Sequence, residues 1–354
     1  DPMPLMDAIW QGWDDHGDRP AAVWRAIETL EPSSAAELFQ LAALTAHVGS
    51  SREVTGRTGF AHLFEHLLFL ESENLGFGGL DEMSARIGGS GANGSTSRDR
   101  TNYFQTVPND SLEKMIWAEA DKLGWFINTV TQPVLEKEKQ VVKNEKRQGV
   151  DNAPFGHNRY VIDKNLYPEG HPYSWQVIGS LDDLQAATLD DVKDFFKRWY
   201  VPNNVTLVIA GDFDAAQAKE WVHHYFDEIP RGPDITPLPK QPAVLAESKH
   251  LKYEDTFARQ PQLSMVWPAA HLYHPDTYAL DYLTELLADG EQSPFYKVLV
   301  EEEKLTQGVS MYSYESEIAG QLELVIRAYD DTDLDSVKSA IDKAFKKFGI
   351  FGRI

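Results

Sequence analysis

The amino-acid sequence predicts an α+β protein built from two related units, and three observations carry this prediction. Apolar, strand-like runs are followed by amphipathic helices within each half of the chain, which favours α+β over a doubly wound parallel sheet. The pattern at 103–107 and 110–126 recurs weakly at 322–328 and 333–348, as expected of a duplicated unit. Residues 231–242 contain four prolines and one glycine, which exclude a regular helix or strand and predict a linker.

The first third of the chain combines one strand signal with two loop signals. Residues 38–48 form an apolar run typical of a strand, and residues 50–58 form a polar loop. Residues 76–94 are rich in glycine without any phosphate-binding spacing, so we interpret them as a loop. Residues 1–35 carry three tryptophans and scattered acids without clear periodicity, which indicates an N-terminal extension.

Periodicity further along the chain predicts helices at 110–126 and 215–226 and a buried strand at 205–210. Thr188 precedes a helix start and is a typical N-cap residue. The expected division of the chain is an extension at 1–35, a first α+β unit at 36–231, a linker at 232–242 and a partial second unit at 243–354.

The pentad His62-Leu63-Phe64-Glu65-His66 is the main functional signal. His62 and His66 lie one helical turn apart, so both imidazoles can reach one metal ion. The apolar residues around them follow helical spacing on one face, at Phe60, Leu63, Phe64, Leu67 and Leu68. His62, Glu65 and His66 project from the other side, where a metal ion would satisfy them better than a hydrophobic core would.

A catalytic zinc ion usually has three protein ligands and one open position. The segment 135–147 contains no glycine and no proline, and it predicts a strong helix. Glu138 and Glu145 are two turns apart on one face of this helix. One of them can bind the metal while the other orients a ligand histidine. By itself, however, this segment is also typical of a solvated Glu/Lys helix.

The motifs together resemble the inverted zinc peptidases, the pitrilysin, insulin-degrading enzyme and mitochondrial processing peptidase family. The resemblance rests on the following segments: 59–69, 93–97, 101–104, 141–145, 167–173 and 202–212. It is strong over about 40–230 and weaker over 255–330. It implies a smaller, bacterial-type member in which two related α/β-roll units, each an antiparallel sheet packed with helices, face each other across a cleft.

Carried over residue by residue, the resemblance implies that His62, His66 and Glu145 bind Zn²⁺ and that Glu138 orients a ligand. Glu65 would be the general base of a metalloendopeptidase that uses a zinc-activated water. The resemblance also places Asn93 and Gly94 on an edge strand that pairs with the backbone of the substrate. Such pairing selects flexible peptides or unfolded segments.

The sequence departs from the family pattern in three places. The family's opening strand is not visible before Leu38, and the second unit ends after one strand–helix passage. An arginine and a tyrosine that hold substrate in many members are replaced here by Val300 and Gln307. This absence suggests a homodimer or heterodimer in which a related subunit supplies the Arg/Tyr pair. The alternative is that this branch binds its substrate differently.

Composition limits the partners without deciding the function. The net charge of −22 disfavours nucleic acid and anionic membranes. No apolar run reaches 18 residues, so no transmembrane helix is expected. The chain has no cysteine, which excludes a thiol nucleophile. The start at Asp1 shows no signal peptide and no initiator Met, as in a processed mature chain. This slightly favours a periplasmic or secreted location over a cytoplasmic one.

Two other functions compete with a peptidase. Some relatives with this fold are non-catalytic subunits, but their pentad is usually degraded, whereas His62, Glu65 and His66 are all present here. A hydrolase acting on other substrates is disfavoured by the edge-strand motif at 93–97, because strand pairing needs a peptide backbone. The remaining histidines lack ligand spacing to the pentad and are expected to be structural or exposed: His157, His171, His223, His224, His271 and His274.

Overall fold

The computed structural model describes residues 25–26 and 39–349. Their contacts separate two compact units, Asp1–Val142 with Val177–Thr236, and Lys143–Gln176 with Pro237–Ile354. The units are therefore interleaved along the chain, because a segment from its middle packs with the C-terminal part. The division falls inside α5 (Gln132–Lys146), which is one continuous helix. The domain boundaries expected from the sequence remain a prediction.

The first unit is built on a five-stranded sheet in the order β1-β5-β2-β4-β3. Its strands are β1 (Arg25–Ala26), β2 (Phe39–Ala46), β3 (Ser90–Thr96), β4 (Thr101–Pro108) and β5 (Val205–Ala210). All pairings are antiparallel except that of β1 with β5. Strand β3 pairs only with β4 in the described sheet, so one of its edges carries no strand, and its register shifts between Ser90 and Asn93.

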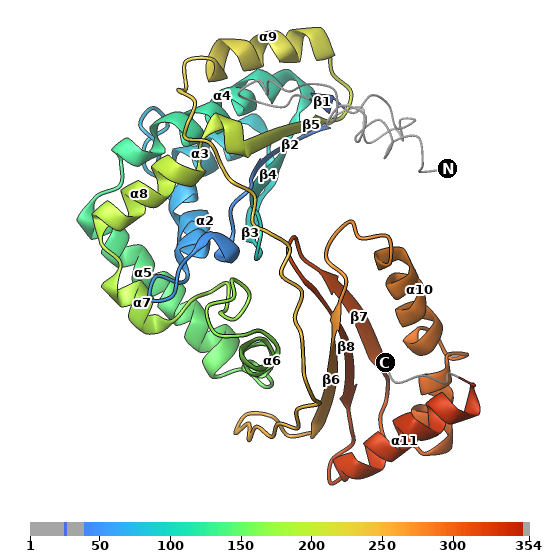
Figure 1. Ribbon diagram of the computed structural model, residues 1–354. Coiled ribbons are helices and arrows are strands. Elements are labelled where there is room, and N and C mark those ends of the chain that lie inside the picture. Colours follow the sequence, from blue (N-terminus) through green and yellow to red (C-terminus); the bar gives the residue numbers. More distant parts are fainter. Residues whose placement is uncertain (1–24, 27–38, 350–354) are drawn as a thin grey trace. The chain divides into compact units, whose positions relative to one another are not determined.

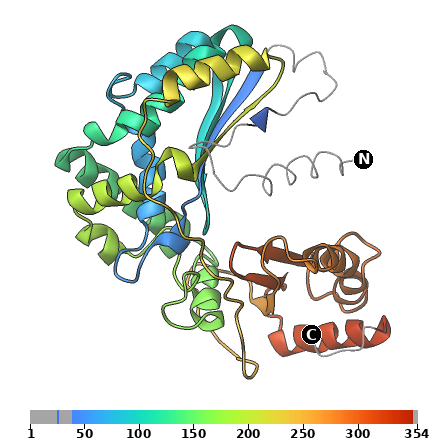
Figure 2. The same ribbon diagram turned by 45° about the horizontal axis from the view of Figure 1, so that its top comes forward.

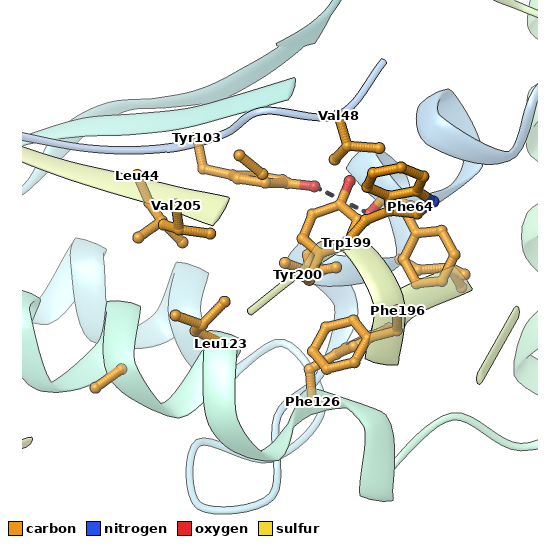
Figure 3. Close-up of a cluster of buried hydrophobic side chains, with 14 of the residues drawn as sticks. Leu44, Val48, Phe64, Tyr103, Leu123, Phe126, Phe196, Trp199, Tyr200 and Val205 are labelled. Atoms are coloured by element: carbon orange, nitrogen blue, oxygen red, sulfur yellow. Dashed lines mark hydrogen bonds between the residues drawn. The ribbon is translucent and has the colours of Figure 1, made fainter. Parts of the chain in front are cut away.

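The helices of the first unit gather on one side of this sheet (Figures 1 and 2). They are α2 (Phe60–Leu70), α3 (Gly79–Ile87), α4 (Leu112–Trp125), most of α5, α7 (Leu181–Ala186), α8 (Leu189–Trp199) and α9 (Ala215–Phe226). Alternate residues of β4 are buried against them. Figure 3 shows the aromatic centre of this core, where Phe64 lies among Phe126, Phe196 and Tyr200. The ring centroids of Phe64 and Tyr200 are 5.3 Å apart.

Most of the predicted elements of the first unit are confirmed. The strand at 205–210 and the helix at 215–226 have the expected bounds. Thr188 caps α8 in a capping box, in which its hydroxyl accepts from the Asp191 N–H and the Asp191 carboxylate accepts from the Thr188 N–H. The extension expected at 1–35 lies outside the described residues, except for Arg25 and Ala26, which form β1.

The loop predicted for residues 76–94 is wrong, because the segment contains helix α3 and strand β3. Its glycines instead mark the ends of these elements. Gly78 and Gly88 take left-handed backbone angles as the N-cap and C-cap residues of α3, with φ of 69° and 77°. Between them, Leu80 is buried on the inner side of the helix.

The second unit contains a three-stranded antiparallel sheet in the order β6-β8-β7. Its elements are β6 (Gln262–Ala269), α10 (Thr277–Ala288), the π-helical η6 (Tyr296–Glu302), β7 (Ser310–Glu315), β8 (Gly320–Arg327) and α11 (Leu334–Lys347). Helices α10 and α11 lie on one side of this sheet (Figure 1), around a core that includes Leu324 and Ile341. The strand order matches β2-β4-β3 of the first unit. Along the chain, α10 and α11 come after β6 and β8 as α2 and α4 come after β2 and β4. The predicted duplication and the α+β class are thus confirmed.

Helix α6 (Asn158–Leu166) shows why the middle segment belongs to the second unit. The Asn158 side-chain amide donates to the carboxylate of Glu323 on β8 at 3.2 Å. The Arg159 guanidinium lies 4.5 Å from the ring centroid of Tyr314 on β7. A further anchor is His171, which is hydrogen-bonded to the Gln241 carbonyl.

The predicted linker, residues 232–242, has no helix or strand, as its prolines require. Within the described part of the chain, no helix combines the length and the apolar character that crossing a membrane requires.

Candidate metal centre

Helix α2 presents the pentad as the sequence predicts. Its buried residues are Phe60, Ala61, Leu63, Phe64, Leu67 and Leu68. His62, Glu65 and His66 are half-buried instead, so the three polar side chains share the side away from the core. The rings of His62 and His66 lie 4.8 Å apart, close to perpendicular. One turn of helix therefore brings both imidazoles to one place.

The start of α2 is held by the carboxylate of Glu53. Glu53 accepts hydrogen bonds from the N–H groups of Gly59 and Ala61 at 2.9 and 2.8 Å. These are donors that a helix start leaves without an intrahelical partner. Gly59 has a φ of 89°, and a Cβ there would lie 2.8 Å from the Ile178 carbonyl, so only glycine fits. Burial raises the pKa of Glu53 to about 8, although its backbone donors act in the opposite direction.

Glu145, near the C-terminal end of α5, joins the two histidines. Single ligand atoms of His62, His66 and Glu145 all lie within 4.8 Å of one another. Zinc holds imidazole nitrogen and carboxylate oxygen at about 2.0–2.2 Å, so small side-chain rotations would bring the three atoms onto one ion. Within the described part of the chain, no other group of three or more such side chains has this proximity.

Glu138, two turns before Glu145, contacts His66. Its Oε1 lies 3.1 Å from His66 Nδ1, and its side chain is only 6% exposed. With Nδ1 facing this carboxylate, Nε2 is the His66 atom left to face a metal ion. A buried carboxylate on the far nitrogen fixes the orientation and tautomer of a ligand histidine. The structure thus places both glutamates named from the sequence, Glu138 and Glu145, beside the histidines of α2.

Strand β3 packs directly on Glu65. Thr96 Oγ1 donates a hydrogen bond to Glu65 Oε2 at 2.5 Å. A Cβ added at Gly94 would lie 3.0 Å from Glu65 Cγ and 3.0 Å from the Phe69 ring, so the strand packs closely against both side chains. Asn93, the residue before, is exposed at the edge, and its Oδ1 accepts from the Gly94 N–H at 2.8 Å.

Tyr103 of β4 links the sheet to α2 through a hydrogen bond. Its hydroxyl donates to the Phe64 carbonyl at 3.2 Å (Figure 3). Burial raises the pKa of Tyr103 well above its usual range, so the phenol stays a donor.

Three contact residues were not singled out from the sequence as site residues: Glu53, Thr96 and Tyr103. Thr96 and Tyr103 lie inside motifs that carry the family resemblance, but only the fold shows which groups they touch. For Glu53 the sequence held one signal. The residue before the pentad helix is glycine, which has no side chain to cap it, so an upstream acid was a reasonable candidate.

Comparison with known proteins identifies the family. Residues 30–165 match the model described as "Insulinase (Peptidase family M16)", and residues 186–352 match "Peptidase M16 inactive domain". Together the two models cover most of the chain. The chain belongs to peptidase family M16. The pitrilysin- and insulinase-like resemblance seen in the sequence is thereby confirmed.

Individual M16 proteins give the same result. The chain is 32% identical over 261 residues to "Zinc protease PqqE" of Helicobacter pylori, which covers 73% of this chain and 58% of that protein. It is 25% identical to "Uncharacterized zinc protease YmxG" of Bacillus subtilis, over 77% of this chain and 64% of that protein. A crystal structure of a Helicobacter pylori protease superposes with a TM-score of 0.79 at 26% identity, covering 89% of this chain and 76% of the other.

The match is therefore to part of these M16 proteins. The chain spans 58% and 64% of the two curated relatives just described. A structure of the first half of the periplasmic protease PqqL from Escherichia coli, at 20% identity and a TM-score of 0.67, supports the fold alone. Several M16 relatives are named zinc proteases, so zinc belongs to the family.

Proposed function

We propose that this chain is a zinc metalloendopeptidase that hydrolyses peptide bonds in flexible peptides or unfolded segments. One observation carries the proposal: ligand atoms of His62, His66 and Glu145 converge within 4.8 Å of one another. The two histidines lie on α2, the helix that also bears Glu65, and Glu145 lies on α5. Membership of family M16, with relatives named zinc proteases, supports it.

The donor set fits zinc. Two imidazoles and one carboxylate are a usual set for a catalytic zinc ion, which keeps its fourth position open. Glu138 would hold His66 in place through Nδ1. The carboxylate of Glu145 is exposed and the histidines are half-buried, so the centre is accessible from solvent.

The chain's own residues would divide the chemistry. When bound, zinc would activate a water molecule and polarise the carbonyl of the scissile bond. Glu65 would take a proton from the attacking water and deliver it to the leaving amine. The open edge of β3, at Asn93 and Gly94, would pair with the substrate as an added strand. The Gly94 N–H, which donates to Asn93 Oδ1, would exchange this bond for one to the peptide.

A second candidate is a peptidase half that works only with a related subunit. Val300 and Gln307 stand where the family resemblance places the substrate-holding arginine and tyrosine. One of the two matching family models is named as an inactive domain, and the chain spans only part of its relatives. These findings favour a chain that binds zinc and depends on a partner for full turnover.

The test is cleavage of a quenched peptide library by the purified chain, with zinc measured by mass spectrometry. Glu65→Gln should retain zinc and lose at least about 100-fold in kcat, because a general base contributes about 10²–10⁴-fold. Glu82→Gln, an exposed acid on α3, is the matched control and should behave as the parent.

Zinc in the parent with no cleavage would favour the partner-dependent form. A parent chain that binds no zinc would contradict the proposal in both forms.

A further inference from the structure

The contact of Thr96 with Glu65 joins the edge strand to the residue proposed as general base. Thr96 Oγ1 donates to Glu65 Oε2 at 2.5 Å in a half-buried setting. Hydrogen bonds of a hydroxyl to a carboxylate are short and stronger than neutral ones. Two residues earlier, a Cβ added at Gly94 would lie 3.0 Å from Glu65 Cγ, so β3 packs closely against this side chain. Strand β3 therefore meets the Glu65 side chain at two points, one through packing and one through a hydrogen bond.

The hydroxyl of Thr96 is itself held in place. Thr96 is paired with Thr101 of β4 at the end of the hairpin. Thr101 Oγ1 donates to the Val48 carbonyl at 2.9 Å and lies 3.5 Å from Thr96 Oγ1. A β-branched side chain on a paired strand has a restricted χ1. The donor thus points at Glu65 from a fixed backbone, unlike a donor on a mobile loop.

We propose that Thr96 is a positioning residue that holds Glu65 in the conformation needed for proton transfer. The inference rests on the proposed function, in which Glu65 is the base. By engaging Oε2, Thr96 leaves Oε1 as the oxygen free to accept the proton. A free glutamate side chain has three rotatable bonds, and fixing it in advance removes an entropic and geometric cost from the reaction.

The same arrangement links substrate pairing to the base. Asn93 and Gly94, which would pair with the peptide, lie on the strand that carries Thr96. A peptide added to this edge would therefore be aligned with the strand that also sets the position of Glu65. A purely structural alternative is that Thr96 only fastens β3 to α2. The two roles differ in what they predict for kcat, KM and stability.

The experiment compares Thr96→Val, which keeps the shape and removes the donor, with Thr96→Ser, which keeps the donor. Thr96→Val should lower kcat by about 10- to 100-fold, because a misplaced catalytic group costs up to about that much. KM, zinc content and Tm should stay close to those of the parent, and Thr96→Ser should recover most of the kcat. Thr106→Val, on the neighbouring strand β4, is the matched control and should leave all four quantities unchanged.

A double variant separates the two roles. In a Glu65→Gln background, Thr96→Val should cause no further loss of residual cleavage, because it acts through Glu65. An unchanged kcat, an effect on KM alone, or equal losses from both Thr96 variants would overturn the inference, and so would a loss of zinc or of Tm that accounts for the drop.

One readout does not depend on turnover. Crystal structures of the parent and Thr96→Val should show the Glu65 carboxylate in one conformation in the parent and displaced in the variant. If the parent binds no zinc, the proposed function is at fault, and if it binds zinc but cleaves nothing, the partner-dependent form is favoured. In either case this comparison still decides whether Thr96 positions Glu65. An undisplaced Glu65 in the variant would refute the inference.

Discussion

Two acidic side chains at α2, those of Glu53 and Glu65, are held in different surroundings. Glu65 is half-buried, and its carboxylate accepts from one side-chain hydroxyl. Glu53 is 7% exposed and accepts from two backbone N–H groups at the helix start. Burial dominates at Glu53 and raises its pKa to about 8. The Glu53 side chain, which accepts from the N–H groups at the start of α2, is thus also a group that titrates near neutral pH.

This shift makes the stability of the protein depend on pH. The folded pKa of Glu53 is about 8 and the ordinary value is 4.5, so between these values the folded state binds more protons than the unfolded state. The free energy of unfolding should therefore fall as pH rises from 4.5 to 8, on the order of a few kcal/mol for this group. Below pH 4.5 the contribution is fully present.

The measurement is urea unfolding of the parent and Glu53→Gln at pH 5 and pH 8, with a chelator present so that zinc binding does not contribute. The parent should lose more stability than the variant over this interval. Equal pH dependence in the two proteins would show that Glu53 does not titrate in this range.

Single residues of the site divide into those that sequence reasoning can reach and those that it cannot. His62 with His66, and Glu138 with Glu145, are each related by helical spacing along one short segment, so they could be named in advance. Thr96 and Glu53 reach α2 from outside the helix, and no spacing rule relates them to the pentad. The contact of Thr96 depends on how the sheet packs against α2, and the contacts of Glu53 depend on how the loop before α2 folds. Only the fold shows either.

At the scale of elements, α2 depends on aromatic packing for its position. Phe64 is fully buried, and its ring centroid lies 5.2 Å from that of Phe195 and 5.3 Å from that of Tyr200. His62 and His66, two residues before and two residues after Phe64 in the helix, are metal-ligand candidates. A cavity at Phe64 would therefore loosen the site as well as the core.

Phe64→Ala should lower the free energy of unfolding by about 3–5 kcal/mol, the usual cost of truncating a buried aromatic side chain. Phe77→Ala is the matched control, because Phe77 is 64% exposed, and it should change stability by less than about 0.5 kcal/mol. Chemical denaturation of both variants, followed by zinc titration, checks the prediction. A cost at Phe64 no larger than at Phe77 would mean that the aromatic cluster does not support α2.

Elements with a clear period were the predictable ones. The strand at 205–210 and the helix at 215–226 have an unbroken apolar pattern, and the structure gives both the same bounds. The segment 76–94 was wrongly predicted to be a loop because its many glycines are typical of loops. Its helical signal, Leu80, Met83 and Ile87, was present but short. Strand β3 is mostly exposed and small in its side chains, so no apolar alternation marks it.

At the scale of the whole molecule, the chain has a complete candidate metal centre but lacks the expected substrate-holding pair. Gln307 is exposed and Val300 is half-buried, and neither side chain can provide the charge of an arginine or the phenol of a tyrosine. The proposed zinc site uses residues of α2 and α5 alone, whereas substrate holding would need groups that this chain does not provide at positions 300 and 307. Zinc binding should therefore be measurable in this chain even where peptide cleavage is weak.

We expect the purified chain to bind zinc at one equivalent and to cleave peptides poorly at every protein concentration. Adding a related M16 chain that carries arginine and tyrosine seven residues apart should raise kcat/KM by about 10-fold or more, since well-oriented substrate holding is worth several kcal/mol. The control is the same partner with its arginine changed to alanine, which should give little stimulation. Specific activity that is already high in the chain alone, and that neither partner changes, would show that this branch of the family holds its substrate through other residues of its own.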